Sequence, residues 1–219
     1  DGASLPQETA IAVKAAVLPF ARFRTPEGVV VDSLLSPEMR STGEVMGLDK
    51  HYDTAFAKAQ AGAGSPLPTS GKVFISVANH DKRNVIIYAK MLESLGFEII
   101  STGGTAEILR RNGLNSIVVA SKFAEAQGEH SIVDMVRNGD IDLILNTPAG
   151  GAARSDGYEI RAAAVSVGCP VMTTISEFAA AVQAIAALRE HSWNIMSLQE
   201  HDLELSEAVA SRGAEGGEA

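Results

Sequence analysis

The sequence predicts an α/β fold, with a mainly parallel sheet and helices on both faces, over residues 72–201. Three observations support this. Apolar, β-branched runs of strand length alternate with longer runs of helical periodicity. Most of the helical runs are closed by a glycine, the usual residue just beyond a helix end. The connections are short, which favours right-handed crossovers between parallel strands.

Five runs have the composition of strands buried on both faces, being rich in Val, Ile and Leu. They read KVFISVA (72–78), FEII (97–100), SIVVA (116–120), DLILN (142–146) and PVMTT (170–174). A last short strand is expected near residues 194–198.

The helical runs lie between these strands, at residues 81–96, 105–113, 130–139, 157–168 and 176–190. Asp81 is the expected N-cap of the first of these helices and Ser176 that of the last. The arrangement directs attention to the residues after each strand, because ligands in such sheets bind outside the carboxyl ends of the strands.

The remaining residues divide the chain into further parts. Residues 1–60 are less regular and too few to bury a core of their own, so we interpret them as the end of a larger domain. Residues 61–71, AGAGSPLPTSG, have the composition of a linker. Residues 202–219, which end in SRGAEGGEA, are expected to be a disordered tail.

Composition excludes several classes of function. The net charge of −9 and the pI of about 5.0 argue against a nucleic-acid or membrane-surface binder. No apolar run approaches the roughly 20 residues that span a bilayer. The single cysteine, Cys169, fits a reducing cytoplasm, and the five histidines share no metal-ligand spacing with it. We therefore expect a cytoplasmic protein without a metal site in this chain.

The residues at and after the strand ends share one chemistry, since they offer hydroxyls, lysines, a carboxamide and glycines. A phosphate group binds such donors, above all at the start of a helix, where free N–H groups and the helix dipole favour an anion. The candidates at and after the five strands are Ser76, Asn79, His80, Asp81 and Lys82; Thr102, Gly103, Gly104 and Thr105; Ser121 and Lys122; Asn146, Thr147, Pro148, Gly150 and Gly151; and Thr173 and Thr174.

Simpler interpretations stand beside this one. Thr102 or Thr105 can serve as an ordinary helix N-cap, and Asn146 as a turn former. Lys82 opposes the dipole of the helix it precedes, which makes a purely solvated role less natural. The sequence has neither the G-x-S-x-G pattern of a hydrolase nucleophile nor a complete phosphate-binding P-loop.

Two stretches carry a family resemblance. VKAAVLPF (13–20) and LLSPEMRSTGEVMG (34–47), followed by YDTAFAKAQ (52–60), resemble the end of the second ATP-grasp half of the carbamoyl phosphate synthetase large subunit. Residues 72–201 resemble the C-terminal allosteric domain of that subunit, which has the fold of methylglyoxal synthase. The resemblance implies that residues 1–60 end an ATP-grasp domain and that the chain is a non-catalytic part of a ligase.

The resemblance also implies an effector site. In the family this domain binds a nucleotide monophosphate, with UMP lowering and IMP raising activity in many bacterial members. The contacts carried over are Ser76, Lys82, Thr102, Gly104, Thr105, Lys122, Asn146 and Thr147. Pro148 stands where the enteric pattern has a second threonine, so this position lacks the hydroxyl and the N–H of that threonine.

The family context extends to partners and cofactors. The whole enzyme makes carbamoyl phosphate from bicarbonate, glutamine-derived ammonia and ATP, for pyrimidine and arginine synthesis. ATP with Mg or Mn would bind the remaining ATP-grasp parts, and no cofactor is expected here. The implied partners are the rest of the large subunit and a glutaminase small subunit, and a homo-oligomer is compatible with the pattern.

A second effector of the family, ornithine, binds between the ATP-grasp end and the allosteric domain. Thr173 matches the family pattern there, but Ala15 replaces a glutamate and Val171 a tyrosine. Loss of the carboxylate removes the partner of the ornithine amine. We expect ornithine activation to be weak or absent.

Two enzymes of related fold are alternatives. Methylglyoxal synthase needs an aspartate base after the fourth strand. Here that loop reads NTPAGGAARSD (146–156), and its carboxylate, Asp156, fits a helix N-cap. A cyclohydrolase of purine synthesis shares the GGTA turn, but residues 1–60 do not support it.

Overall fold

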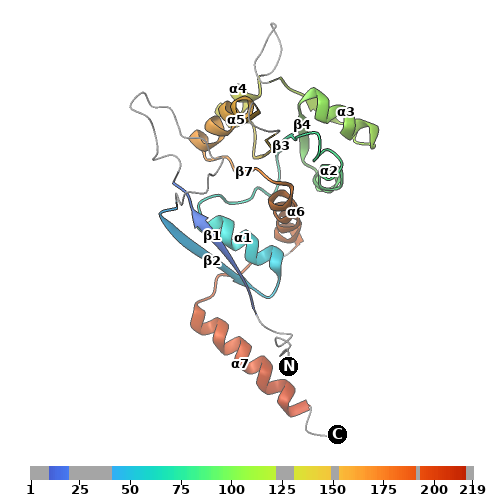
Figure 1. Ribbon diagram of the computed structural model, residues 1–219. Coiled ribbons are helices and arrows are strands. Elements are labelled where there is room, and N and C mark those ends of the chain that lie inside the picture. Colours follow the sequence, from blue (N-terminus) through green and yellow to red (C-terminus); the bar gives the residue numbers. More distant parts are fainter. Residues whose placement is uncertain (1–9, 20–40, 122–130, 149–152, 191–192, 216–219) are drawn as a thin grey trace.

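The computed structural model describes residues 10–19, 41–121, 131–148, 153–190 and 193–215. Its centre is a five-stranded sheet of order β5-β4-β3-β6-β7 in which every pairing is parallel. The strands are β3 (Lys72–Ser76), β4 (Glu98–Ser101), β5 (Ile117–Val119), β6 (Leu143–Asn146) and β7 (Val171–Met172). The predicted α/β fold with a parallel sheet is confirmed (Figure 1).

Helices cover both faces of this sheet, as predicted (Figure 1). The helices between its strands, and the one after β7, are α2 (Val85–Ser94), α3 (Gly103–Arg111), α4 (Ile132–Arg137), α5 (Ala153–Val167) and α6 (Ile175–Glu190). Alternate residues of β3 separate the two cores, because successive side chains of a strand point to opposite faces. Val73 and Ile75 pack with α2, α3 and α6, whereas Phe74 packs with α4 and α5.

The strand order identifies where a ligand would bind. From β3 the chain proceeds outward to β4 and β5, then returns to the other side of β3 and continues through β6 and β7. The order therefore reverses between β3 and β6, and such a switch point opens a crevice at the carboxyl ends of the strands. Ser76 and Asn146 are register partners at that end.

The N-terminal part is a small two-stranded antiparallel sheet with one helix. It consists of β1 (Ile11–Val17), β2 (Gly43–Asp49) and α1 (Tyr52–Gly62). A side chain at Gly47 would overlap the backbone of Ala55 and Ala59, so only glycine allows α1 to lie this close to β2. This explains the final glycine of the PEMRSTGEVMG stretch.

Helix α1 joins this part to the larger sheet. Phe56 and Ala57 on its inner face belong to the same core cluster as Phe178 of α6. Figure 1 shows α1 lying beside α6, between the small sheet and the large one. The linker is therefore not the sole connection between the two parts, because they also share a packed helix pair.

Several predicted boundaries differ from the structure. The first helix of the large sheet begins at Val85, and residues 81–84 form a turn in which Asn84 and Val85 donate to the carbonyl of Asp81. Asp81 is therefore not the N-cap. Ser176 is not a cap either, because α6 begins at Ile175 and follows Thr174. Both predictions used residue type alone: the turn at 81–84 delays the start of α2, and Thr174 rather than Ser176 accepts from an N–H of the first turn of α6.

The C-terminal predictions were wrong for the described residues. Residues 194–198 contain no strand, and in place of a disordered stretch from residue 202 the structure has α7 (Leu198–Glu215). A capping box begins this helix: Glu200 N–H donates to Ser197 Oγ, and Ser197 N–H donates to the Glu200 carboxylate. The glycine-rich end of the chain had obscured this signal.

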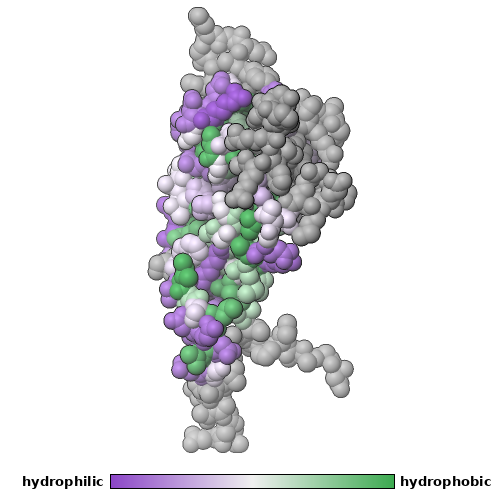
Figure 2. Space-filling view, turned by 90° about the vertical axis from the view of Figure 1, so that its left-hand side faces the viewer, coloured by the Kyte–Doolittle hydropathy of each residue, from purple (hydrophilic) through white to green (hydrophobic). Residues whose placement is uncertain are grey.

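The surface near α7 mixes apolar and polar residues. Ile195, Leu198 and Leu203 are all exposed. In Figure 2 apolar and polar side chains alternate on the lower part of the visible face, at the level of α7. Among the described helices, none combines the length and the apolar character required to cross a bilayer.

Candidate functional site

Polar side chains from three neighbouring strand ends meet at the carboxyl edge of the large sheet. Ser76 ends β3, and its Oγ lies 3.3 Å from Oγ1 of Thr102, which follows β4. Asn146 ends β6 on the other side of β3. The structure therefore brings together side chains that the sequence separates by up to 70 residues. We call Ser76, Lys82, Thr102, Gly104, Thr105, Asn146 and Thr147 the strand-end site.

Thr102 and Thr105, the two threonines of the TGGTA segment (102–106), do not act as side-chain caps. Thr102 occupies the N-cap position of α3, with extended backbone angles, but its side chain makes no capping hydrogen bond. Thr105 is 2% exposed, and its Oγ1 accepts a hydrogen bond from Val77 N–H at 3.4 Å. The ordinary capping role therefore does not account for either hydroxyl, and the N–H groups at the start of α3 have no side-chain acceptor from Thr102.

Thr147 ties the loop after β3 to the end of β6. Its Oγ1 accepts from Ala78 N–H at 2.9 Å, and its own N–H donates to the Ser76 carbonyl at 3.2 Å. A hydroxyl that accepts in this way keeps its hydrogen for another partner. The hydroxyls of Thr105 and Thr147 are thus positioned by the backbone and remain able to donate to an anion.

Lys82 supplies a positive charge beside the start of α3. Its Nζ lies 3.3 Å from the point that a Cβ on Gly104 would occupy. The ammonium therefore sits over the first turn of α3 (Gly103–Arg111), next to the free N–H groups and the positive end of the helix dipole. Two sources of positive potential converge there, which is unfavourable for the empty protein and favourable for a bound anion.

Two residues of this region were not found by sequence reasoning. Arg161 of α5 is fully buried, and its Nη1 donates to Asn146 Oδ1 at 2.7 Å. Gly157, one turn earlier, lies against both groups. The available signal was helical spacing: Arg161 adjoins Ile160 on the buried face of a helix rich in alanine, where an arginine needs a polar partner.

Some predicted residues cannot be assessed. Lys122 lies outside the described residues, as do the glycines at 150 and 151. Pro148 is described and follows Thr147 directly, in keeping with its predicted place in the loop. The described residues hold no group of three or more His, Cys, Asp or Glu side chains that could bind a metal ion.

A cavity of about 370 Å³ lies between β1 and β7 and is called here the seam cavity. It is lined by Val13, Lys14, Ala15, Ala16, Leu18, Phe56, Ala59, Gln60, Ala63, Ser65, Pro170, Val171, Met172 and Glu177. Ala15 and Val171, the two positions that depart from the family pattern, thus share one cavity. Thr173 directly follows β7 (Val171–Met172), whose two residues line the cavity.

Glu177 is the carboxylate of the seam cavity, and the start of α6 uses it. Its Oε2 accepts from Thr173 N–H at 3.3 Å, while Thr174 Oγ1 accepts from Glu177 N–H at 3.2 Å, which is a variant of the capping box in which the carboxylate binds the N–H one residue before the N-cap. Burial raises the pKa of Glu177, and the hydrogen bond from Thr173 opposes this only in part. The carboxylate therefore already has a structural role.

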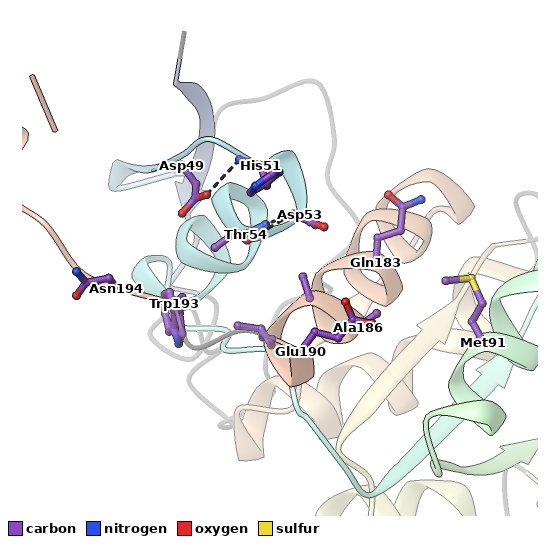
Figure 3. Close-up of a pocket in the computed structure, with 12 residues that line it drawn as sticks. Asp49, His51, Asp53, Thr54, Met91, Gln183, Ala186, Glu190, Trp193 and Asn194 are labelled. Carbon is purple, nitrogen blue, oxygen red and sulfur yellow. Dashed lines mark hydrogen bonds between the residues drawn. The ribbon is translucent and has the colours of Figure 1, made fainter. Parts of the chain in front are cut away.

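Another cavity, of about 540 Å³, lies between the start of α1 and the end of α6 (Figure 3). Asp49 and Asp53 face it from one side and Glu190 and Trp193 from the other. Burial alone would raise the pKa of Asp49, but the Lys58 ammonium at 2.8 Å and backbone N–H groups lower it. Because the Asp49 carboxylate is already paired with Lys58, this cavity is a weaker candidate for a ligand site than the strand-end site.

Comparison with known proteins first identifies the class of domain. The family described as "MGS-like domain" matches residues 84–173, which include Thr102, Thr105, Asn146 and Thr147. The strand-end site thus lies largely within an MGS-like domain.

The relatives then identify the larger protein family. The chain is 65% identical to the carbamoyl phosphate synthase large chain of Kocuria rhizophila over 98% of its own length and 19% of that protein. It is 62% identical to that of Paenarthrobacter aurescens and 57% identical to that of Corynebacterium glutamicum, covering 20% and 18% of them. The expected family relationship is confirmed, and the chain spans about a fifth of the length of the curated relatives it matches.

Proposed function

We propose that this chain is the regulatory region of a carbamoyl phosphate synthase large chain, and that its strand-end site binds a nucleotide monophosphate such as UMP or IMP. The observation that carries the proposal is the convergence of Lys82, two backbone-positioned threonine hydroxyls and the start of α3 at one sheet edge. These groups are donors or cations, as a phosphate requires.

The proposal assigns a separate role to each side of the site. Lys82, Thr102, Thr105 and the N–H groups of α3 would hold the phosphate, and Asn146 would contact the rest of the nucleotide. Lys122 would add a second cation, as the family pattern implies. No residue of the site is assigned a catalytic role.

The proposed whole protein is a ligase that makes carbamoyl phosphate from bicarbonate, glutamine-derived ammonia and ATP, for pyrimidine and arginine synthesis. ATP with Mg or Mn, and a glutaminase small subunit, would be bound by parts outside this chain. We assign residues 1–60 to the end of an ATP-grasp domain and residues 72–201 to the allosteric domain, with 61–71 between them.

Regulation requires coupling, since an effector must favour one arrangement of this domain relative to the catalytic body. The packing of α1 on α6, through Phe56 and Phe178, offers a rigid route from the large sheet to β1 and β2. A coupling free energy of about 1–3 kcal/mol would be ordinary for such a system.

The test is calorimetric titration of the full-length protein with UMP and IMP, combined with activity assays at saturating nucleotide. We expect saturable binding of at least one nucleotide and a change in carbamoyl phosphate synthesis. Absence of binding at millimolar concentrations of both would contradict the proposal.

A methylglyoxal synthase activity is the alternative that the MGS-like fold favours. It would release phosphate from dihydroxyacetone phosphate and would need a carboxylate base at the site. An assay of phosphate release from that substrate separates the two functions, and we expect no release above background.

A further inference from the structure

Asn146 is held in one orientation by a buried arginine. Arg161 has no exposed surface, and its Nη1 donates to the Asn146 side chain at 2.7 Å. A guanidinium has only donors, so the atom that faces it must be the carboxamide oxygen, Oδ1. This contact removes the usual ambiguity between the two ends of an asparagine side chain.

We infer that Arg161 is a positioning residue that turns the Asn146 amide nitrogen, Nδ2, toward the ligand and so makes this corner of the strand-end site specific for a hydrogen-bond acceptor. The inference rests on the proposed function. With Oδ1 engaged by Arg161, the NH₂ group is the part of the carboxamide that remains to bind a nucleotide.

Gly157 makes the contact sterically feasible. A Cβ at this position would overlap both Nη1 of Arg161 and Oδ1 of Asn146. Gly157, Asn146 and Arg161 are all buried, so a side chain at position 157 would displace this contact. The three residues form one unit in which the absence of a side chain allows the hydrogen bond to form.

The chemistry of the ligand follows from this orientation. An amide N–H binds a carbonyl, ribose or phosphate oxygen, and it cannot pair with a group that only donates. The site therefore suits a ligand that offers an acceptor oxygen beside β6 (Leu143–Asn146).

The experiment measures UMP and IMP affinity and thermal unfolding of the full-length protein in matched variants. Arg161→Met removes the donor at similar length, and Arg161→Lys retains a donor and a charge. We expect about a tenfold loss of affinity in the methionine variant, and partial recovery in the lysine variant. The matched control is Arg110→Met, whose arginine donates to the Ile117 carbonyl at the opposite end of α3.

Asn146→Asp is a second variant that separates positioning from folding. Its carboxylate still accepts from Arg161, so the buried arginine keeps its partner and the melting temperature should be maintained. It has no N–H group and adds a negative charge, so we expect nucleotide affinity to fall by more than in Arg161→Met.

The outcomes are distinguishable. If the unsubstituted protein binds neither nucleotide, both the proposed function and this inference fail. If it binds, and folded Arg161→Met and Asn146→Asp bind with unchanged affinity, only the inference fails, and Arg161 is a purely structural residue. A selective loss of affinity with normal binding by Arg110→Met supports the inference.

Discussion

The strand-end site and the seam cavity have opposite chemistry: the first lies at the carboxyl edge of the large sheet, and the second lies between β1 and β7. At the strand ends Ser76, Thr102 and Thr105 present hydroxyls, and Lys82 adds a charge. In the seam cavity Ala15 and Val171 stand where the family pattern has polar side chains, and Glu177 is occupied as a helix cap. Donor groups are thus gathered at the first place, whereas the second has an alanine and a valine at the two positions that depart from the family pattern, and we propose that only the first binds an effector.

The largest effect is expected when the positive charge of Lys82 is removed from the strand-end site. Lys82→Ala should weaken UMP and IMP binding by about tenfold to a hundredfold, because a hydrogen bond to a charged group contributes about 1.5–3 kcal/mol. Calorimetric titration of the full-length protein measures the effect.

Lys90→Ala is the matched control, since Lys90 is exposed on α2 and remote from the strand ends. Equal affinity in the Lys82 and Lys90 variants would contradict the assignment of Lys82 to the site.

The next test places a carboxylate at position 15 of the seam cavity, where the family pattern has a glutamate. We expect the natural sequence to show weak or no ornithine activation, and Ala15→Glu to increase ornithine affinity by about threefold to fivefold, as expected for a partly exposed ion pair. Ornithine titration and activity assays measure both.

Ala12→Glu is the control, because Ala12 is exposed on the same strand and does not line the cavity. Ornithine activation of ordinary strength in the unsubstituted protein would show that Ala15 and Val171 do not disable this region.

A smaller effect is expected from Glu177. Because burial raises its pKa above the ordinary 4.5, the folded state favours the protonated carboxyl. Its contribution to stability is therefore present below pH 4.5 and is lost as the pH rises through the raised pKa.

Glu177→Gln should remove this dependence while keeping the capping box, and it should raise stability near neutral pH by on the order of 1 kcal/mol. Thermal unfolding across a pH series measures the difference, with the exposed Glu190→Gln as control. If stability depended on pH in the same way in the natural protein and in Glu177→Gln, the prediction for Glu177 would be contradicted.

The last prediction concerns the reactivity of the Cys169 thiol. Cys169 directly precedes Pro170, which lines the seam cavity. Burial, together with the nearby carboxylate of Asp142, raises the pKa of its thiol to about 12, so almost no reactive thiolate exists at neutral pH. Iodoacetamide should label Cys169 far more slowly in the folded than in the unfolded protein, without affecting nucleotide binding. Mass spectrometry of the peptide that contains Cys169 gives the rates, and rapid labelling in the folded state would contradict the prediction.

Much of the fold was predictable because its signals are local. The strands and the helices between them follow from apolar periodicity and closing glycines, and α/β alternation implies the parallel sheet. Helix starts were less predictable: Asp81 and Ser176 are good capping types, yet a turn precedes Val85 and Thr174 caps the helix that starts at Ile175. The Ser197 and Glu200 capping box shows that the missed α7 also had a local signal.

By itself, the sequence determined which residues follow each strand, and hence the chemical character of the strand-end site, because residue type and strand position are both encoded locally. Tertiary structure alone decided that Ser76 meets Thr102, that Thr147 holds the loop after β3, and that Arg161 fixes Asn146. Such contacts join elements far apart in the chain, and they exist only when the sheet order and helix packing place those elements side by side.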